Sequence, residues 1–166
     1  MEIEESLDSE ASVTDVLSFV EGLLEGESNR IANLANISAL LNQYLKNINW
    51  VGFYLIEADT RDFVLGPFAG RPACTRITPP RGVVGTAVRD ARTILVDDVL
   101  QFPGHIACDS ASRSEIVVPI VAADEVVAVL DVDSPRLGRF TEIDKELLEA
   151  IARKLEHRWS AMREYR

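Results

Sequence analysis

Apolar residues recur with helical spacing in two stretches near the start of the chain. In residues 12–24 they form one stripe, made of Val13, Val16, Leu17, Val20, Leu23 and Leu24. Ser12, followed three positions later by Asp15, suits the N-terminal cap of this helix. A similar one-sided pattern predicts a second helix over residues 29–47. Two helices are therefore expected ahead of the first strand.

From Trp50 onward the pattern becomes that of strands. Aromatic and β-branched residues flank a polar turn at 58–62, which predicts a hairpin. Residues 66–81 are so rich in Gly and Pro that we expect mostly a long loop, and long loops in compact domains tend to be functional. After this loop we predict a short helix over 82–90. Three further strands are predicted, over 93–99, 114–121 and 125–134.

A final long helix is predicted from Thr141, which forms a second capping pair with Asp144. The order is then helices, a strand-dominated middle and a last helix. This segregation favours an α+β fold with a central antiparallel sheet and helices packed on it. The length of 166 residues fits a single domain over 1–166, within which we expect 1–11 to be a flexible N-terminal segment.

Charge and hydropathy narrow the classes of partner. The formal net charge is -10, from 27 acidic and 17 basic residues, so the long-range field repels phosphate backbones and anionic membrane surfaces. We therefore expect no nucleic-acid partner and no membrane partner. No apolar run approaches the roughly 20 residues that span a bilayer, and the acidic start lacks the basic and apolar regions of a signal peptide. These features predict a cytoplasmic protein.

The two cysteines are too few for a structural disulfide framework, so their reactivity is an open question. Cys108 lies in a polar turn with His105 three residues before it, and nearby positive charge favours the reactive thiolate. Asp109 acts in the opposite direction, and a small buried hydrophobe is the alternative reading of Cys108. Cys74 lies between two arginines in "RPACTR", where it is either a reactive thiol or an incidental loop residue.

Two uses of these residues depend on the fold. Cys74 and Cys108 can form a disulfide only if the fold brings their Cα atoms within about 7 Å. Zinc would need cysteines and histidines in short paired spacings, which positions 74, 105, 108 and 157 lack. We therefore predict no metal site and no other cofactor.

Three carboxylates and two aromatic residues complete the set of candidates. Asp131 and Asp133 alternate along a strand and so share one face, and Glu115 begins another strand. Such a pair is ordinarily a solvated face, but three carboxylates at one pocket would suit an amine, a metal or a shared proton. Trp50 and Tyr54 also share a strand face, where they either pack in the core or form an aromatic wall.

Five blocks of the chain resemble one enzyme family. They are "NWVGFYL", "LGPFAGRPAC", "RGVVGTA", "FPGHIACDSASRSEIVVPI" and "VLDVDS". In this order and spacing, from about residue 49 to residue 134, they closely resemble the free methionine-(R)-sulfoxide reductases, which are built on a GAF domain. The resemblance implies a GAF-like fold and reduction of the R epimer of methionine sulfoxide as a free amino acid.

The resemblance also implies roles for the candidate residues. It assigns Cys108 as the catalytic cysteine, Cys74 as the resolving one, and Glu115, Asp131, Asp133, Trp50 and Tyr54 to the substrate pocket. Cys108 would become a sulfenic acid, Cys74 would close a disulfide with it, and thioredoxin would reduce that disulfide. A carboxyl kept protonated, that of Glu115 or of an aspartate, would deliver a proton to the departing oxygen, and the remaining carboxylates would bind the substrate ammonium.

Some alternatives stay open at this stage. The family commonly has a third cysteine where this chain has Val84, which would leave Cys74 as the resolving partner. The rival function is a GAF module that binds a small molecule or senses redox state without turnover. The sequence leaves open which carboxylate donates the proton, what His105 does, and whether the protein forms a homodimer.

Overall fold

The computed structural model describes residues 12–106 and 108–164, so the N-terminal segment predicted to be flexible lies outside the described residues. Within these ranges, none of the helices combines the length and the apolar character needed to cross a bilayer. The helices are α1 (Val13–Gly26), α2 (Arg30–Tyr44), α3 (Gly82–Asp90), α4 (Glu142–Arg158) and two 3₁₀ turns, η1 (Val99–Gln101) and η2 (Trp159–Ala161). The strands are β1 (Trp50–Ile56), β2 (Phe63–Gly70), β3 (Arg76–Ile77), β4 (Ile94–Val96), β5 (Ser114–Ala122) and β6 (Glu125–Ser134).

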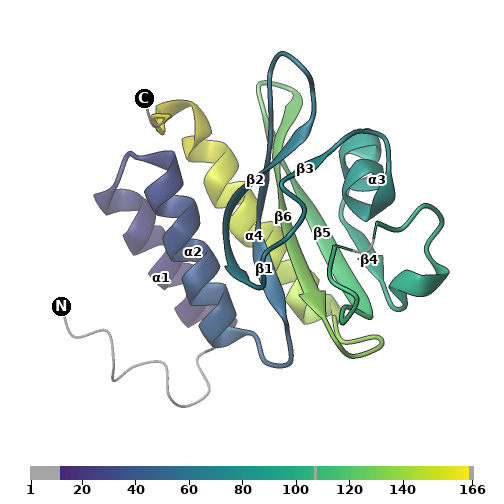
Figure 1. The fold of residues 1–166 in the computed structure, drawn as a ribbon. Coiled ribbons are helices and arrows are strands. Elements are labelled where there is room, and N and C mark those ends of the chain that lie inside the picture. Colours follow the sequence, from purple (N-terminus) through teal and green to yellow (C-terminus); the bar gives the residue numbers. More distant parts are fainter. Residues whose placement is uncertain (1–11, 107, 165–166) are drawn as a thin grey trace.

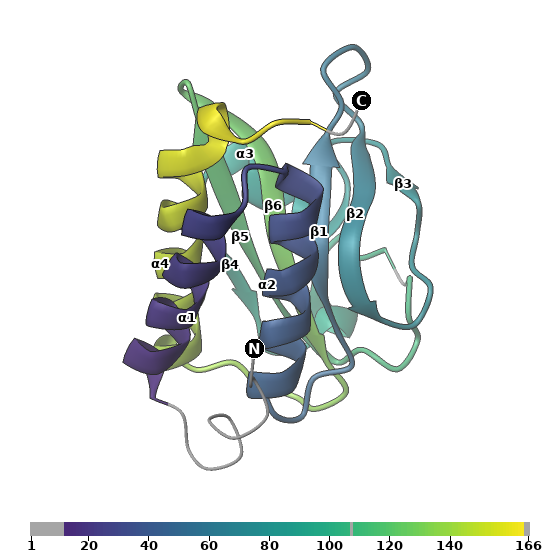
Figure 2. The same cartoon turned by 90° about the vertical axis from the view of Figure 1, so that its left-hand side faces the viewer.

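The strands form one sheet in the order β3-β2-β1-β6-β5-β4, and every neighbouring pair is antiparallel. Helices α1, α2 and α4 cover one face of this sheet, while α3 lies against the other face (Figures 1 and 2). The predicted α+β fold with a central antiparallel sheet is therefore confirmed.

Alternation along the central strands builds a separate apolar layer on each face. On β1, Val51 and Phe53 point into the larger layer beneath α1, α2 and α4. Trp50 and Tyr54 point to the other face, into the smaller layer that includes α3. Successive strand residues point to opposite faces, so this arrangement follows directly from the sequence pattern. The side chains of Trp50 and Tyr54 consequently share a face with α3.

Local signals in the sequence are confirmed at the helix ends and at one turn. Ser12 with Asp15 and Thr141 with Asp144 both form complete capping boxes. A two-residue turn joins the strands predicted at 114–121 and 125–134, and its residues Ala123 and Asp124 both have positive φ, as a type I′ hairpin turn requires.

The predicted loop over 66–81 is partly wrong. Strand β2 continues to Gly70, and β3 forms within the remaining stretch. The strand tolerates Pro67 because the ladder with β1 shifts register opposite Phe53, between the pairs made by Gly52 and Tyr54. A proline lacks the N–H that a regular ladder needs, and such an irregularity removes that need. The Gly and Pro content therefore marks a bulge rather than the end of the strand.

Two other elements, α2 and β4, are shorter than predicted. Helix α2 ends at Tyr44, where the helix expected over 29–47 would have continued, and β4 covers three residues of the stretch 93–99. Asp98 caps η1 by accepting a hydrogen bond from the N–H of Leu100, which turns the chain away from the sheet. The polar residues after β4 therefore begin a turn instead of extending the strand.

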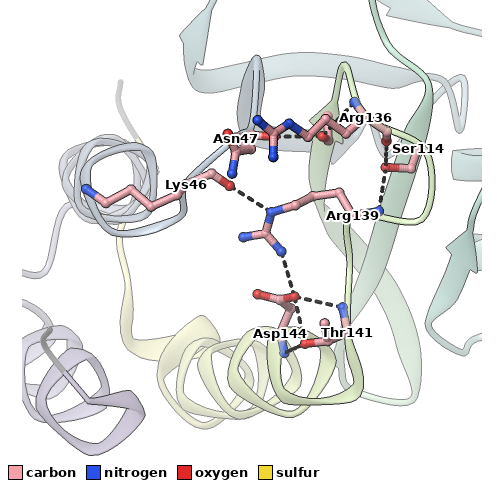
Figure 3. A network of polar contacts seen from close by, with 8 residues as sticks. Lys46, Asn47, Ser114, Arg136, Arg139, Thr141 and Asp144 are labelled. Atoms are coloured by element: carbon pink, nitrogen blue, oxygen red, sulfur yellow. Dashed lines mark hydrogen bonds and ion pairs between the residues drawn. The ribbon is translucent and has the colours of Figure 1, made fainter.

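Arg139 joins three segments that meet at one end of the sheet (Figure 3). Its Nε donates to the carbonyl of Lys46 over 2.7 Å, and its Nη1 donates to Oδ2 of Asp144 over 2.9 Å. Its backbone N–H donates to Oγ of Ser114 over 3.3 Å, one residue before Glu115. The loop before β1, the start of β5 and the start of α4 are therefore held together where the candidate residues lie.

The substitution Arg139→Gln tests this junction. Arg139 and Asp144 are only 17% and 12% exposed, and hydrogen bonds to charged groups contribute about 1.5–3 kcal/mol. We expect the free energy of unfolding in urea to fall by about 2 kcal/mol. The matched control is Arg136→Gln, because this exposed side chain makes no hydrogen bond among the described residues and should change stability by less than about 0.5 kcal/mol. Equal losses in the two variants would contradict the role given to Arg139.

Candidate active site

The pairing of three strands brings the candidate carboxylates together. Asp133 on β6 lies opposite Glu115 on β5 and opposite Trp50 on β1. Asp131, two residues earlier, occupies the same face of β6. One oxygen from each of the three carboxyl groups lies within 4.8 Å of the others. The predicted common face of Asp131 and Asp133 is thus confirmed, and Glu115 joins them.

Burial gives these carboxyls unusual protonation. Glu115 is 6% exposed and Asp131 is 5% exposed, while Asp133 is more accessible. Burial raises the pKa of Asp131 to about 7. Burial, together with the neighbouring carboxylates, also raises the pKa of Glu115 and of Asp133 well above the ordinary range. The cluster therefore retains protons at neutral pH that exposed carboxyls would have lost.

Trp50 and Tyr54 form a stacked aromatic wall beside the carboxyls. Their ring centroids lie 6.0 Å apart, and Phe68 also stacks with Trp50, with ring centroids 5.4 Å apart. Two glycines leave room for the indole, because a Cβ at Gly52 or at Gly70 would come within 2.8 Å of its ring carbons. The glycines of β1 and β2 therefore serve to seat Trp50 against the sheet.

The two cysteines form a disulfide, and Cys108 lines the cavity that also holds the carboxyls and the aromatic wall. Their Cα atoms lie 5.5 Å apart, which satisfies the distance that the sequence left open. Cys108 comes from the turn before β5, and Cys74 comes from the short segment between β2 and β3. The cavity is lined by residues of both cysteine segments, by Trp50 and Tyr54, by the start of α3 and by all three carboxyls.

The structure gives Tyr54 a contact that the sequence did not reveal. Its hydroxyl donates a hydrogen bond to the carbonyl oxygen of Cys74 over 2.9 Å. Burial first, and then the charges of Asp131, Asp133 and Glu115, raise the pKa of this phenol. It therefore stays protonated and acts as a donor.

Asn49 is a second residue that the sequence reasoning missed. Its Nδ2 donates to Oδ2 of Asp109 and to Oγ of Ser112, each over 3.1 Å, and its backbone N–H donates to the carbonyl of Asp133. These bonds tie the turn that carries Cys108 to the start of β1. The only signal in the sequence was that Asn49 begins the block "NWVGFYL".

Two further residues of the cavity, His105 and Val84, supply neither a positive charge nor a thiol at neutral pH. Burial lowers the pKa of His105, so its imidazole is neutral at neutral pH and does not favour a Cys108 thiolate by its charge. Val84 on α3 is buried and lines the cavity at the position where the resembling family commonly has a third cysteine. His157 is exposed on α4 and does not line this cavity.

The arrangement suits a small cation next to a redox-active sulfur. The Oδ1 atom of Asp131 is buried and has no hydrogen-bond partner among the described residues. Three crowded carboxyl oxygens can accept an ammonium group or a metal ion, and an ammonium would supply N–H donors for the unpaired oxygen. The aromatic wall gives the same ligand an apolar surface to pack on.

Comparison with known proteins places this chain in a family. The GAF domain family matches residues 33–156. The chain is 52% identical to the free methionine-R-sulfoxide reductase of Escherichia coli over 81% of this chain and 80% of that protein. It is also similar to the X-ray structure of free methionine-R-sulfoxide reductase from Neisseria meningitidis in complex with its substrate, with a TM-score of 0.88 and 43% identity, over 92% of this chain and 93% of that one.

A further solved structure agrees with these two. The reduced form of the Staphylococcus aureus enzyme of the same kind is 50% identical, with a TM-score of 0.84, and the match covers 90% of this chain and 96% of that chain. Identity and coverage of this extent, together with the GAF match, confirm the resemblance carried by the five sequence blocks. The chain therefore belongs to the free methionine-R-sulfoxide reductase family of GAF domain proteins.

Proposed function

We propose that this protein reduces free methionine-R-sulfoxide to methionine through a cycle of Cys108 and Cys74. The observation that supports this most strongly is one cavity lined by the three clustered carboxyls and by Cys108, which is bonded to Cys74. Relatives named for this activity in E. coli and N. meningitidis match almost the whole fold. The proposal therefore combines the chemistry of the site with the family of the chain.

The carboxyls account for the preference for a free amino acid. Only a free amino acid carries an α-ammonium beside its side chain, and this group would bind where Asp131 has an unpaired buried oxygen. Methionine within a protein has an uncharged amide at this position. It would therefore leave the carboxylate cluster around Asp131 without a positively charged partner. The thioether portion of the substrate would pack against Trp50.

The redox cycle has three steps. The sulfur of Cys108 attacks the sulfoxide sulfur, and the oxygen passes to Cys108, so that methionine leaves and Cys108 becomes a sulfenic acid. The Cys74 thiol then attacks this sulfenic sulfur, and a disulfide forms with release of water. An external protein dithiol, which we take to be thioredoxin, reduces the disulfide by exchange and is itself oxidised. The bonded cysteines correspond to the state before this last step.

The raised pKa values supply a proton for the first step. The sulfoxide oxygen must gain a proton as the sulfur is reduced, and a carboxyl that stays protonated at neutral pH can donate it. Glu115 and Asp133 both have a pKa raised by burial and by neighbouring carboxylates, and both lie in the wall of the cavity. Either group fits the role of general acid, while the remaining carboxylates hold the ammonium.

The substrate can be tested with separated epimers. We expect consumption of NADPH, coupled through thioredoxin and its reductase, with the R epimer of free methionine sulfoxide. The S epimer and N-acetyl-methionine-R-sulfoxide should be poor substrates, because the second lacks the ammonium. Binding of the R epimer without production of methionine would instead support a sensing module and overturn the proposed reduction.

Serine substitutions separate the two cysteines. We expect Cys108→Ser to form no methionine, because the nucleophile is lost. We expect Cys74→Ser to release about one methionine per protein, and then to stop in the presence of thioredoxin because no disulfide forms. Methionine is measured by mass spectrometry, and free thiols are counted before and after one turnover. Turnover by Cys108→Ser would contradict the assignment.

The protonation of the cluster can be tested through stability. Because burial raises the pKa of Asp131 from 3.8 to about 7, the folded state binds protons more tightly than the unfolded chain does. The free energy of unfolding of the substrate-free protein should therefore fall as the pH rises from about 5 to about 8. We expect a smaller fall in Asp131→Asn, measured by urea unfolding with the disulfide intact. The exposed control Asp59→Asn should keep the parent's dependence, and an unchanged slope in Asp131→Asn would contradict a buried, protonated cluster.

A further inference from the structure

The segment that carries Cys74 is held by few hydrogen bonds. It covers residues 71–75, between β2 and β3, and forms no regular structure. Among the hydrogen bonds between described residues, one backbone bond reaches this segment, from the N–H of Leu65 to the carbonyl of Thr75 over 3.0 Å. One side chain reaches it as well, through the bond from the Tyr54 hydroxyl to the carbonyl of Cys74. Cys74 also packs against the apolar layer that includes α3, but when the disulfide is open this side-chain bond is the remaining hydrogen bond to Cys74 within the described part of the chain.

We propose that Tyr54 is a positioning residue for the resolving cysteine: its hydroxyl holds the backbone of Cys74 beside Cys108, so that the sulfenic acid is converted quickly to the disulfide. This inference deepens the proposed function and rests on it for the identity of the substrate. It differs from a role in the aromatic wall, because the wall needs only the ring of Tyr54.

The setting of Tyr54 makes it a firm anchor. The residue lies in the central strand β1, opposite Leu65 on β2 and Val129 on β6, and it is 2% exposed. Its ring stacks on Trp50, which restricts the direction of the C–O bond. The phenol remains protonated, so the donated hydrogen bond persists across the pH range in which thiols react. A rigid donor thus faces the backbone of an irregular segment.

The consequence for the chemistry concerns only the second step of the cycle. The Cys74 sulfur must reach the sulfur of Cys108, displace the hydroxyl of the sulfenic acid as water, and form the S–S bond. A carbonyl fixed over 2.9 Å keeps the thiol within the Cα separation of 5.5 Å that the disulfide shows. Attack of Cys108 on the sulfoxide does not use the Cys74 thiol. Removal of the hydroxyl should therefore slow disulfide closure more than it slows release of methionine.

The substitution Tyr54→Phe removes the hydroxyl and keeps the buried ring. Rapid mixing of the reduced protein with free methionine-R-sulfoxide would give the rate of methionine release, and mass spectrometry of samples quenched with dimedone would give the rate at which the sulfenic acid disappears. We expect disulfide closure to slow about fivefold, as the loss of about 1 kcal/mol implies. Methionine release is measured alongside, and the positioning role predicts that closure slows by a larger factor than release does. The matched control is Tyr44→Phe on α2, on the other face of the sheet, which should change neither rate.

A second measurement forms the sulfenic acid without methionine sulfoxide. Hydrogen peroxide oxidises the Cys108 thiolate to the sulfenic acid and is reduced to water, after which closure by Cys74 is followed as before. If the parent protein releases no methionine, the proposed substrate is wrong, yet the peroxide measurement still tests Tyr54. The positioning role is supported if closure in Tyr54→Phe is slower with peroxide and if, with the sulfoxide, closure slows by a larger factor than methionine release. Closure at the parental rate, or a loss confined to methionine release, would overturn it.

Discussion

Antiparallel pairing of β6 with β5 on one side and β1 on the other is the constraint on which the site depends. This register sets Asp133 opposite both Glu115 and Trp50. A slip of one residue would turn Asp131 and Asp133 toward the layer beneath α1, α2 and α4, and the cluster would be lost. The apolar residues that alternate with them, among them Leu130 and Val132, prevent such a slip because they fill that layer.

The same pairing carries an energetic cost. Three carboxyls lie within 4.8 Å of one another in a largely buried cavity, and the cluster responds by retaining protons. Such a cluster lowers the stability of the ligand-free fold. A bound ammonium supplies the compensating positive charge, and this favours its binding. The apolar layer on the helical face and the junction around Arg139 hold the strands in place despite this cost.

One strand also links the pocket to the redox pair. Asn49 precedes β1 and holds the turn that follows Cys108, while Tyr54 further along β1 holds the carbonyl of Cys74. The two cysteine segments are distant in sequence, and each is irregular in structure. Because both segments are hydrogen-bonded to residues at or near one central strand, their positions relative to each other are restricted. The thiols can therefore meet without any regular element of their own.

The sequence by itself determined the elements whose signals are local. Capping pairs at Ser12 and Thr141, alternation around Asp131, and the five blocks that resemble the family all depend on near neighbours along the chain, and each prediction is confirmed. Only the tertiary structure decided the continuation of β2 through Pro67 and the bond from Tyr54 to Cys74, because both depend on which strand or loop lies alongside. Burial likewise arises from the packed fold alone, and it is burial that lowers the pKa of His105 and raises the pKa of the carboxyls.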